Sequence, residues 1–127
     1  MTAGTPQADW PPNAASIRDL LEPEILEEVD GRCVLRFSPE PTWTLGNGVV
    51  QGGIVTAMLD MAMAIAAGGC STATITVDIL RPVTGPVITS TGVVDKRGKR
   101  LLFASAELHD AEGRLVARGN QTAVPYD

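Results

Sequence analysis

A single carboxylate in an otherwise apolar stretch is the feature of this sequence best suited to chemistry. The stretch opens with Gly52 and Gly53 and runs to Ala67, with Asp60 in its middle. Read as a helix, it gives Asp60 one polar companion on its own face, Thr56, because positions three and four apart lie above one another. Such an acid is either functional or structural, the latter being solvated at an edge or tied to a backbone N–H or a buried base.

The two glycines before the acid are suited to binding an oxygen atom. The first N–H groups of a helix have no intrahelical partner, and a residue without a side chain lets a carbonyl oxygen approach closely. The alternative is tight backbone packing at a helix start. Since the other faces of the stretch are apolar and lack a broad polar stripe, we expect a buried central helix.

Length and composition indicate one globular domain. The 127 residues, 44% of them hydrophobic, suffice for a core. We expect this domain at residues 14–127, after a flexible arm at residues 1–13. A net charge of −5 disfavours nucleic acid as a partner, because basic surfaces bind phosphates. The longest apolar run is too short to cross a bilayer and no secretory leader is recognised, which predicts a cytoplasmic protein without membrane contact.

Cysteine and histidine chemistry is disfavoured. Cys33 and Cys70 have neither a CxxC spacing nor a nearby histidine, so we expect reduced structural thiols and no metal site. The only histidine, His109, lies on a late predicted strand and is interpreted as a surface residue. No serine lies in a nucleophile-elbow motif, and a single remote histidine offers no triad, which argues against a serine hydrolase.

The elements around the apolar stretch predict an α+β fold. A short helix is expected from Ser16, with Asp19 at the third helical position as an imperfect capping box and Pro23 limiting its length. Four consecutive strands after the central helix would form an antiparallel meander with that helix covering one face. Alternation of polar and apolar residues predicts strands at residues 32–38 and 72–81. Residues 87–94, 101–109 and 114–124 are further candidate strands, the last two joined by a hairpin turn at residues 110–113.

With this order of elements, the sequence resembles the hotdog-fold acyl-CoA thioesterases of the phenylacetate-degradation and 4-hydroxybenzoyl-CoA type. The resemblance implies a hotdog fold, in which an antiparallel sheet wraps around a long central helix. It runs from about residue 32 to residue 124. Its motifs are residues 48–53 followed by Asp60, the Thr-rich strand ending in Arg81-Pro82, the basic turn at 96–100 and the segment 110–119.

The resemblance also implies roles for single residues. Asp60 matches the family's acid, which acts as a base on water or as a nucleophile on the thioester carbonyl. Gly52 matches a glycine whose N–H stabilises the oxyanion, with Gly53 beside it in the substrate site. Thr72 stands where some relatives carry a hydroxyl that holds the attacking water. A strand threonine that faces solvent or the helix is the alternative.

Two positions depart from the family pattern. Gln51 stands where many relatives have histidine, and Leu45 where many have asparagine or glutamine. Gln51 can hold the thioester carbonyl or organise the loop, but unlike histidine it cannot shuttle protons near neutral pH. The lack of a histidine beside the acid also argues against a hotdog-fold dehydratase.

Coenzyme A would be part of the substrate, with no separate cofactor, and its phosphates need basic partners. A charged turn that is merely solvated is the alternative. The family forms dimers through a sheet edge, often paired into tetramers, so we expect a homodimer or a dimer of dimers. The phosphate-binding candidates are Arg81 at a strand end and the residues flanking Gly98 in a predicted hairpin, Lys96, Arg97, Lys99 and Arg100.

Two functions remain open from the sequence. The first is a thioesterase that hydrolyses an aryl-CoA or a short or medium-chain acyl-CoA, and the second is a non-catalytic acyl-CoA-binding or assembly protein, which the departures at Leu45 and Gln51 favour. Trp43 is a candidate for an acyl pocket. So are the helix methionines Met58, Met61 and Met63, although such a spacing is also ordinary core.

Overall fold

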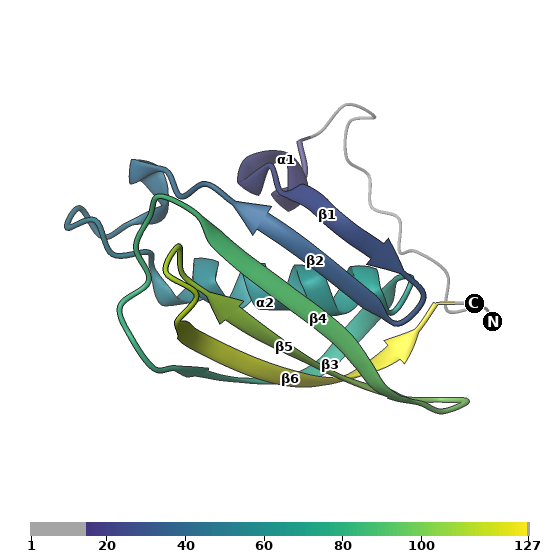
Figure 1. Cartoon of the computed structure of the whole chain (residues 1–127). Coiled ribbons are helices and arrows are strands. Elements are labelled where there is room, and N and C mark those ends of the chain that lie inside the picture. The colour runs from purple at the N-terminus through teal and green to yellow at the C-terminus, as the bar shows by residue number, and fades with distance from the viewer. Residues whose placement is uncertain (1–14, 127) are drawn as a thin grey trace.

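The computed structural model describes residues 15–126, which form a six-stranded antiparallel sheet with a long helix on one face (Figure 1). The predicted α+β architecture is confirmed. Among these residues, no helix is long and apolar enough to cross a membrane. The predicted arm at residues 1–13 lies outside the described range. The elements are α1 (Ile17–Leu21), β1 (Glu24–Val29), β2 (Arg32–Phe37), the 3-10 turn η1 (Pro41–Trp43), α2 (Gly52–Ala66), β3 (Cys70–Ile79), β4 (Ile88–Arg97), β5 (Leu102–His109) and β6 (Leu115–Pro125).

The strand order corrects the predicted meander. The sheet runs β1-β2-β4-β5-β6-β3, so β3 lies at an edge beside β6 and does not pair with β4. Tight turns join β4 to β5 and β5 to β6, and each of these pairs is antiparallel. The connection from β3 to β4 is longer and contains Pro82 and Pro86, which cannot donate ladder hydrogen bonds. It carries the chain away from β3, which leaves that strand free to pair with the last one.

Strand β1 is absent from the sequence-based prediction. Its six residues include three glutamates and show no alternation, and all six are exposed. It forms because an edge strand needs only backbone pairing on one side, here with β2. Surface ion pairs reinforce this pairing, with Glu24 accepting from Arg36 at 2.6 Å and Glu27 from Arg32 at 3.3 Å. Such exposed pairs contribute about 0–1 kcal/mol each.

Helix α1 begins as predicted. Ser16 is the N-cap, its hydroxyl accepts from the Asp19 N–H, and the Asp19 carboxylate accepts from the Ser16 N–H. This reciprocal pair satisfies two N–H groups that the helix leaves free. The helix ends at Leu21, with Glu22 in the left-handed region (φ 46°) immediately before Pro23.

Helix α2 packs one side against the sheet and leaves the other partly open. Its closest approach is at Gly92 of β4, where a Cβ atom would lie 2.5 Å from the backbone of Ala62. Burial of each large side chain on this side contributes about 1.5–3 kcal/mol. The opposite side, which includes Asp60 and Met61, is only partly covered by residues 15–126. The residues buried against the sheet are Val55, Met58, Leu59, Ala62, Met63 and Ala66.

Candidate active site

Asp60 lies near the middle of α2 and is held by a side chain from the edge strand β3. Its Oδ1 accepts a hydrogen bond from Thr72 Oγ at 3.0 Å. Thr72 Oγ lies 2.6 Å from Oε1 of Gln121, a residue of β6 that is only 2% exposed. The three side chains therefore form a chain of polar contacts from the sheet interior to a partly exposed carboxylate.

A β-bulge in β3 brings Thr72 to Asp60. Simple alternation places Thr72 on the face of Thr74, opposite Ile75. In the structure the register of β3 against β6 shifts between Thr72 and Thr74, which leaves Ala73 as the extra residue. A bulge adds one residue to one strand and re-aims the side chain beside it. Thr72 consequently faces α2, one of the two orientations considered as alternatives from the sequence, and its hydroxyl lies 3.0 Å from Asp60 Oδ1.

Sequence reasoning missed Gln121, although its strand position carried a signal. Alternate residues of β6 that face α2 are small, namely Ala117, Gly119 and Ala123. Gln121 occupies the same face and is buried, the one long polar side chain in this series. A buried polar group without an evident partner in the sequence requires a hydrogen-bonding explanation.

An apolar pocket of about 270 Å³ borders Asp60 on the open side of α2. Helix α1 forms its other wall. Of the candidate methionines Met61 lines this pocket, whereas Met58 and Met63 are fully buried in the core. Trp43, at 3% exposure, also belongs to the core. The lining residues are Ile17, Arg18, Ala57, Asp60, Met61, Ala64 and Ile65.

The N-terminus of α2 presents backbone donors next to a capping side chain. Gln51 is the N-cap, and its Oε1 accepts from the Ile54 N–H at 3.1 Å. That oxygen lies 2.7 Å from where a Cβ on Gly53 would stand, so Gly53 gives the Gln51 side chain room to fold back. A Cβ on Gly52 would make only an ordinary contact, 3.6 Å from Ile79 Cδ1. Within residues 15–126 neither glycine N–H donates a hydrogen bond.

One chain alone does not bring Gly52 and Asp60 to the same carbonyl group. They lie eight residues apart on α2, which corresponds to about 12 Å at 1.5 Å per residue. A carbonyl group within hydrogen-bond reach of both would need each of them within about 3 Å. The two groups can therefore act on one thioester only if they come from different chains.

The predicted phosphate-binding residues lie in two separate places. Lys96 and Arg97 end β4, and Lys99 and Arg100 follow in the predicted hairpin turn, all of them exposed. Arg97 donates to the carbonyl of Ala67 at 3.1 Å, which places this basic hairpin (residues 96–100) at the C-terminal end of α2.

Arg81 lies at the opposite end of α2 from the basic hairpin. It follows β3, whose last residue, Ile79, approaches Gly52 at the start of the helix. The structure thus brings together four of the five predicted phosphate-binding residues and separates Arg81 from them.

The thiols near the site are not poised for nucleophilic attack. Cys33 and Cys70 are free and buried. Burial, and secondly the charge of Asp60, raise the pKa of Cys70, while Arg97 opposes this shift. Burial together with Glu28 raises the pKa of Cys33 to about 11. Since the thiolate is the nucleophile, both groups are protonated and unreactive near neutral pH.

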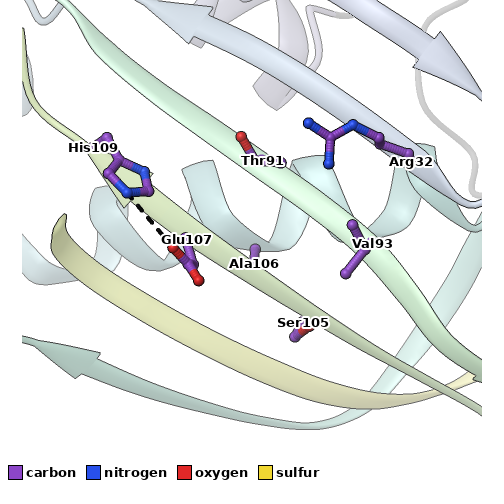
Figure 2. Close-up of a pocket in the computed structure, with 7 residues that line it drawn as sticks. All are labelled: Arg32, Thr91, Val93, Ser105, Ala106, Glu107 and His109. Carbon is purple, nitrogen blue, oxygen red and sulfur yellow. Dashed lines mark ion pairs between the residues drawn. The ribbon is translucent and has the colours of Figure 1, made fainter. Parts of the chain in front are cut away.

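A second hollow, of about 290 Å³, lies on the face of the sheet that points away from α2 (Figure 2). Figure 2 shows His109 and Glu107 next to each other on β5, at one side of this hollow. His109 Nε2 lies 3.5 Å from Glu107 Oε2. His109 is a partly exposed strand residue, as predicted from the sequence. Arg32 at the other side is paired with Glu27. Because Glu107 and Arg32 already have polar partners, the hollow offers less unused chemistry than the pocket at Asp60.

Comparisons with known proteins identify the family of this chain and its fold. Residues 47–117 match the family model described as "Thioesterase superfamily". No curated protein matches the chain in sequence.

Three solved structures illustrate the similarity. S. sahachiroi AziG is 24% identical with a TM-score of 0.81, covering 88% of this chain and 97% of that one. The E. coli PaaI protein from the phenylacetic acid degradation operon is 22% identical with a TM-score of 0.81, covering 87% and 84%. Zebrafish thioesterase superfamily member 2 is 24% identical with a TM-score of 0.75, covering 80% of each chain. Since the family model spans more than half of the sequence and the fold is shared, this chain belongs to the thioesterase superfamily and has its hotdog fold.

Proposed function

We propose that the protein is an acyl-CoA thioesterase that hydrolyses an aryl-CoA or a short or medium-chain acyl-CoA to the free acid and CoA. The observation that carries this proposal is the placement of Asp60, a carboxylate held by Thr72 at the border of an apolar pocket. A carboxylate fixed by one hydroxyl keeps its second oxygen available for a reacting group.

Asp60 activates the attack on the thioester carbonyl. As a base it accepts a proton from water, the oxygen attacks the carbonyl carbon, and the C–S bond breaks so that CoA leaves as a thiolate that takes up a proton. As a nucleophile, its oxygen attacks the carbonyl carbon, the C–S bond breaks so that CoA leaves as a thiolate that takes up a proton, and water hydrolyses the resulting mixed anhydride. Both routes need the same position for the carboxylate, close to the carbonyl carbon.

The oxyanion is stabilised by the Gly52 N–H of a second copy of this chain. The unpaired N–H groups and the positive end of the α2 dipole suit a developing negative charge. Strand β3 is a sheet edge whose residues are largely exposed, and pairing of two such edges gives a dimer. A two-fold axis at that edge reverses α2, which sets the start of one helix beside the middle of the other.

The acyl group occupies the pocket between α1 and α2. Its volume of about 270 Å³ is below the range of 300–1,000 Å³ typical of sites for drug-sized ligands, which favours a small acyl chain or a single aromatic ring. Its apolar wall suits the hydrocarbon part of the substrate. The phosphates of CoA then contact the basic hairpin. In the dimer, Arg81 reaches the same CoA from the opposite end of the two paired α2 helices.

The test is thiol release from a panel of acyl-CoA and aryl-CoA thioesters. We expect turnover of at least one member, and a loss of about a hundredfold or more in Asp60→Asn, the scale of a positioned base. Asp95→Asn is a matched control, because Asp95 Oδ1 also accepts from a hydroxyl, Ser105 Oγ, at 3.1 Å. Unchanged turnover in Asp60→Asn would refute the proposed role of this carboxylate.

A second candidate function is a non-catalytic acyl-CoA-binding protein. It is favoured by the N-terminus of α2, where the Gln51 side chain is engaged in capping and Leu45 is 73% exposed instead of supplying a polar group. Binding of acyl-CoA without thiol release in any member of the panel would support this function and contradict the first.

A further inference from the structure

We infer that Gln121 is a positioning residue, whose side-chain N–H donates to Thr72 Oγ and thereby keeps the Thr72 proton on Asp60. This inference rests on the proposed role of Asp60 in thioester hydrolysis. It assigns a function to a buried side chain that does not itself reach the substrate.

The Thr72 hydroxyl has one proton and two acceptor oxygens beside it. Thr72 Oγ lies 3.0 Å from Asp60 Oδ1 and 2.6 Å from Gln121 Oε1, so it faces two acceptor oxygens. A hydroxyl has one proton and can donate to only one of them. If Gln121 presents its oxygen, the short contact to the hydroxyl competes with Asp60 for that proton.

The amide nitrogen of Gln121 poses a second problem. Gln121 Nε2 is buried and has no hydrogen-bond partner within the described part of the chain. A buried donor without a partner costs about 1–3 kcal/mol. The oxygen and nitrogen of an amide have nearly the same shape, so a half-turn about the last side-chain bond exchanges their places without moving other atoms.

The half-turn ends the competition at Thr72 and gives Nε2 an acceptor, while Oε1 takes the buried place that lacks a partner. Nε2 then donates to Thr72 Oγ, and the hydroxyl has a single acceptor left, Asp60 Oδ1. The hydrogen bonds run in one direction, from Gln121 to Thr72 to Asp60. Chains of this kind polarise one another, which strengthens the last bond. Asp60 Oδ2, which accepts no hydrogen bond within residues 15–126, is left to face water or the thioester.

The kinetic test compares Gln121→Met with a control that also loses a buried polar group. Ser90→Ala removes a hydroxyl that donates to the Met58 carbonyl of α2 at 2.9 Å, away from Asp60. We expect kcat/KM to fall about tenfold in Gln121→Met, the scale of one lost hydrogen bond, and to stay near the wild-type value in Ser90→Ala. Equal losses in the two variants would mean that Gln121 serves packing alone and would overturn the inference.

The pH dependence of kcat/KM separates a positioning role from a packing role, because only the positioning role predicts a shift of the profile in a stated direction. A hydrogen bond to the ionised carboxylate favours that form. In Gln121→Met the Thr72 hydroxyl loses the N–H that orients and polarises it, so its hydrogen bond to Asp60 weakens and the acidic limb of the kcat/KM profile moves to higher pH. If instead Thr72 donates to Gln121 in the wild type, the variant frees that proton for Asp60 and the limb moves to lower pH. Cys70 and Arg18, the other ionisable groups beside Asp60, are unchanged in this variant.

A measurement without substrate separates this inference from the proposed function. The side-chain amide of Gln121 is identified in a ¹⁵N–¹H spectrum by its loss in Gln121→Met. In Thr72→Val one of its proton resonances shifts if the N–H donates to Thr72 Oγ. No shift would overturn the inference even in an active enzyme. A shift in a protein without turnover would uphold the hydrogen bond and refute the thioesterase proposal.

Discussion

Two carboxylates of this protein are held by a hydroxyl in nearly the same way, on opposite faces of one sheet. On the helix side, Thr72 donates to Asp60 over 3.0 Å, and on the outer face Ser105 donates to Asp95 over 3.1 Å. Their surroundings differ. Asp60 borders an apolar pocket and has a buried amide behind its hydroxyl partner, whereas Asp95 is exposed at the end of β4.

This difference shows that a carboxylate held by a hydroxyl is not sufficient for a catalytic site. Chemistry also needs room for the acyl group, a low-dielectric wall and a donor for the developing charge. The helix side offers the first two within one chain. In the proposed dimer, the free N–H groups at the start of α2 of a second copy supply the third.

The contrast in burial between the two faces is sharpest at two neighbours on β5. Leu102 points to α2 and is fully buried, while Phe103 points outward and is 41% exposed. We expect Leu102→Ala to lower the free energy of unfolding by about 2–5 kcal/mol and Phe103→Ala by roughly 1 kcal/mol or less. Urea unfolding measures both. Equal losses would mean that the outer face is also covered, for example by another copy.

The helix-side donor can be removed without removing the helix. Gly52 is the first residue of α2, where proline is tolerated, and Gln51 before it has φ −64° and ψ 141°, a conformation compatible with a following proline. We expect Gly52→Pro to lower kcat by about 10²–10³-fold, with the circular dichroism spectrum retained. Gly52→Ala keeps the N–H and has space for its Cβ, so it should stay close to wild type. Equal rates in these two variants would exclude the Gly52 N–H from catalysis.

The burial of the helix side of the sheet also predicts how the free energy of unfolding depends on pH. The native pKa of Cys33 is about 11, against 9.0 for an unperturbed thiol, chiefly because of burial. Between these values the unfolded thiol loses its proton while the native one keeps it. The free energy of unfolding therefore falls as pH rises through this window, by on the order of 2 kcal/mol. In Cys33→Ala this part of the decline should be missing from urea unfolding between pH 8.5 and 11. The same decline in both proteins would contradict a dry environment for the thiol.

The smallest expected effects concern the cations. Lys99 and Arg100 form no ion pair within the described residues, whereas Arg36 on the outer face is paired with Glu24. We expect Lys99→Gln and Arg100→Gln each to raise KM for CoA thioesters by about threefold, the scale of one exposed charge interaction, with kcat unchanged. Arg36→Gln is the control. A KM that responds equally to all three changes would point to net charge and not to the basic hairpin.

How much of this could be read from the sequence depends on the range of the interactions. Helix α2 and Asp60 were predictable because helical periodicity is local. The cap at Ser16 and the turn before Arg114 follow from short motifs and were also found. The resemblance to hotdog thioesterases supplied the fold and the family.

The features that escaped prediction are set by tertiary contacts. Strand β1 forms through pairing with β2 despite its glutamates, and β3 pairs with β6 because the connection after it is long. The bulge that turns Thr72 toward Asp60 depends on register, which alternation cannot detect. Gln121 became a candidate only when its burial and its contact with Thr72 were known.

The most direct test of the account mixes two variants that are each expected to be inactive. Asp60→Asn and Gly52→Pro chains co-expressed in equal amounts form mixed dimers, in which one of the two sites has an intact Asp60 and an intact Gly52. With random pairing we expect thiol release at about a quarter of the wild-type rate, while each variant alone shows little. No activity above that of the separate variants would contradict a site shared between two chains.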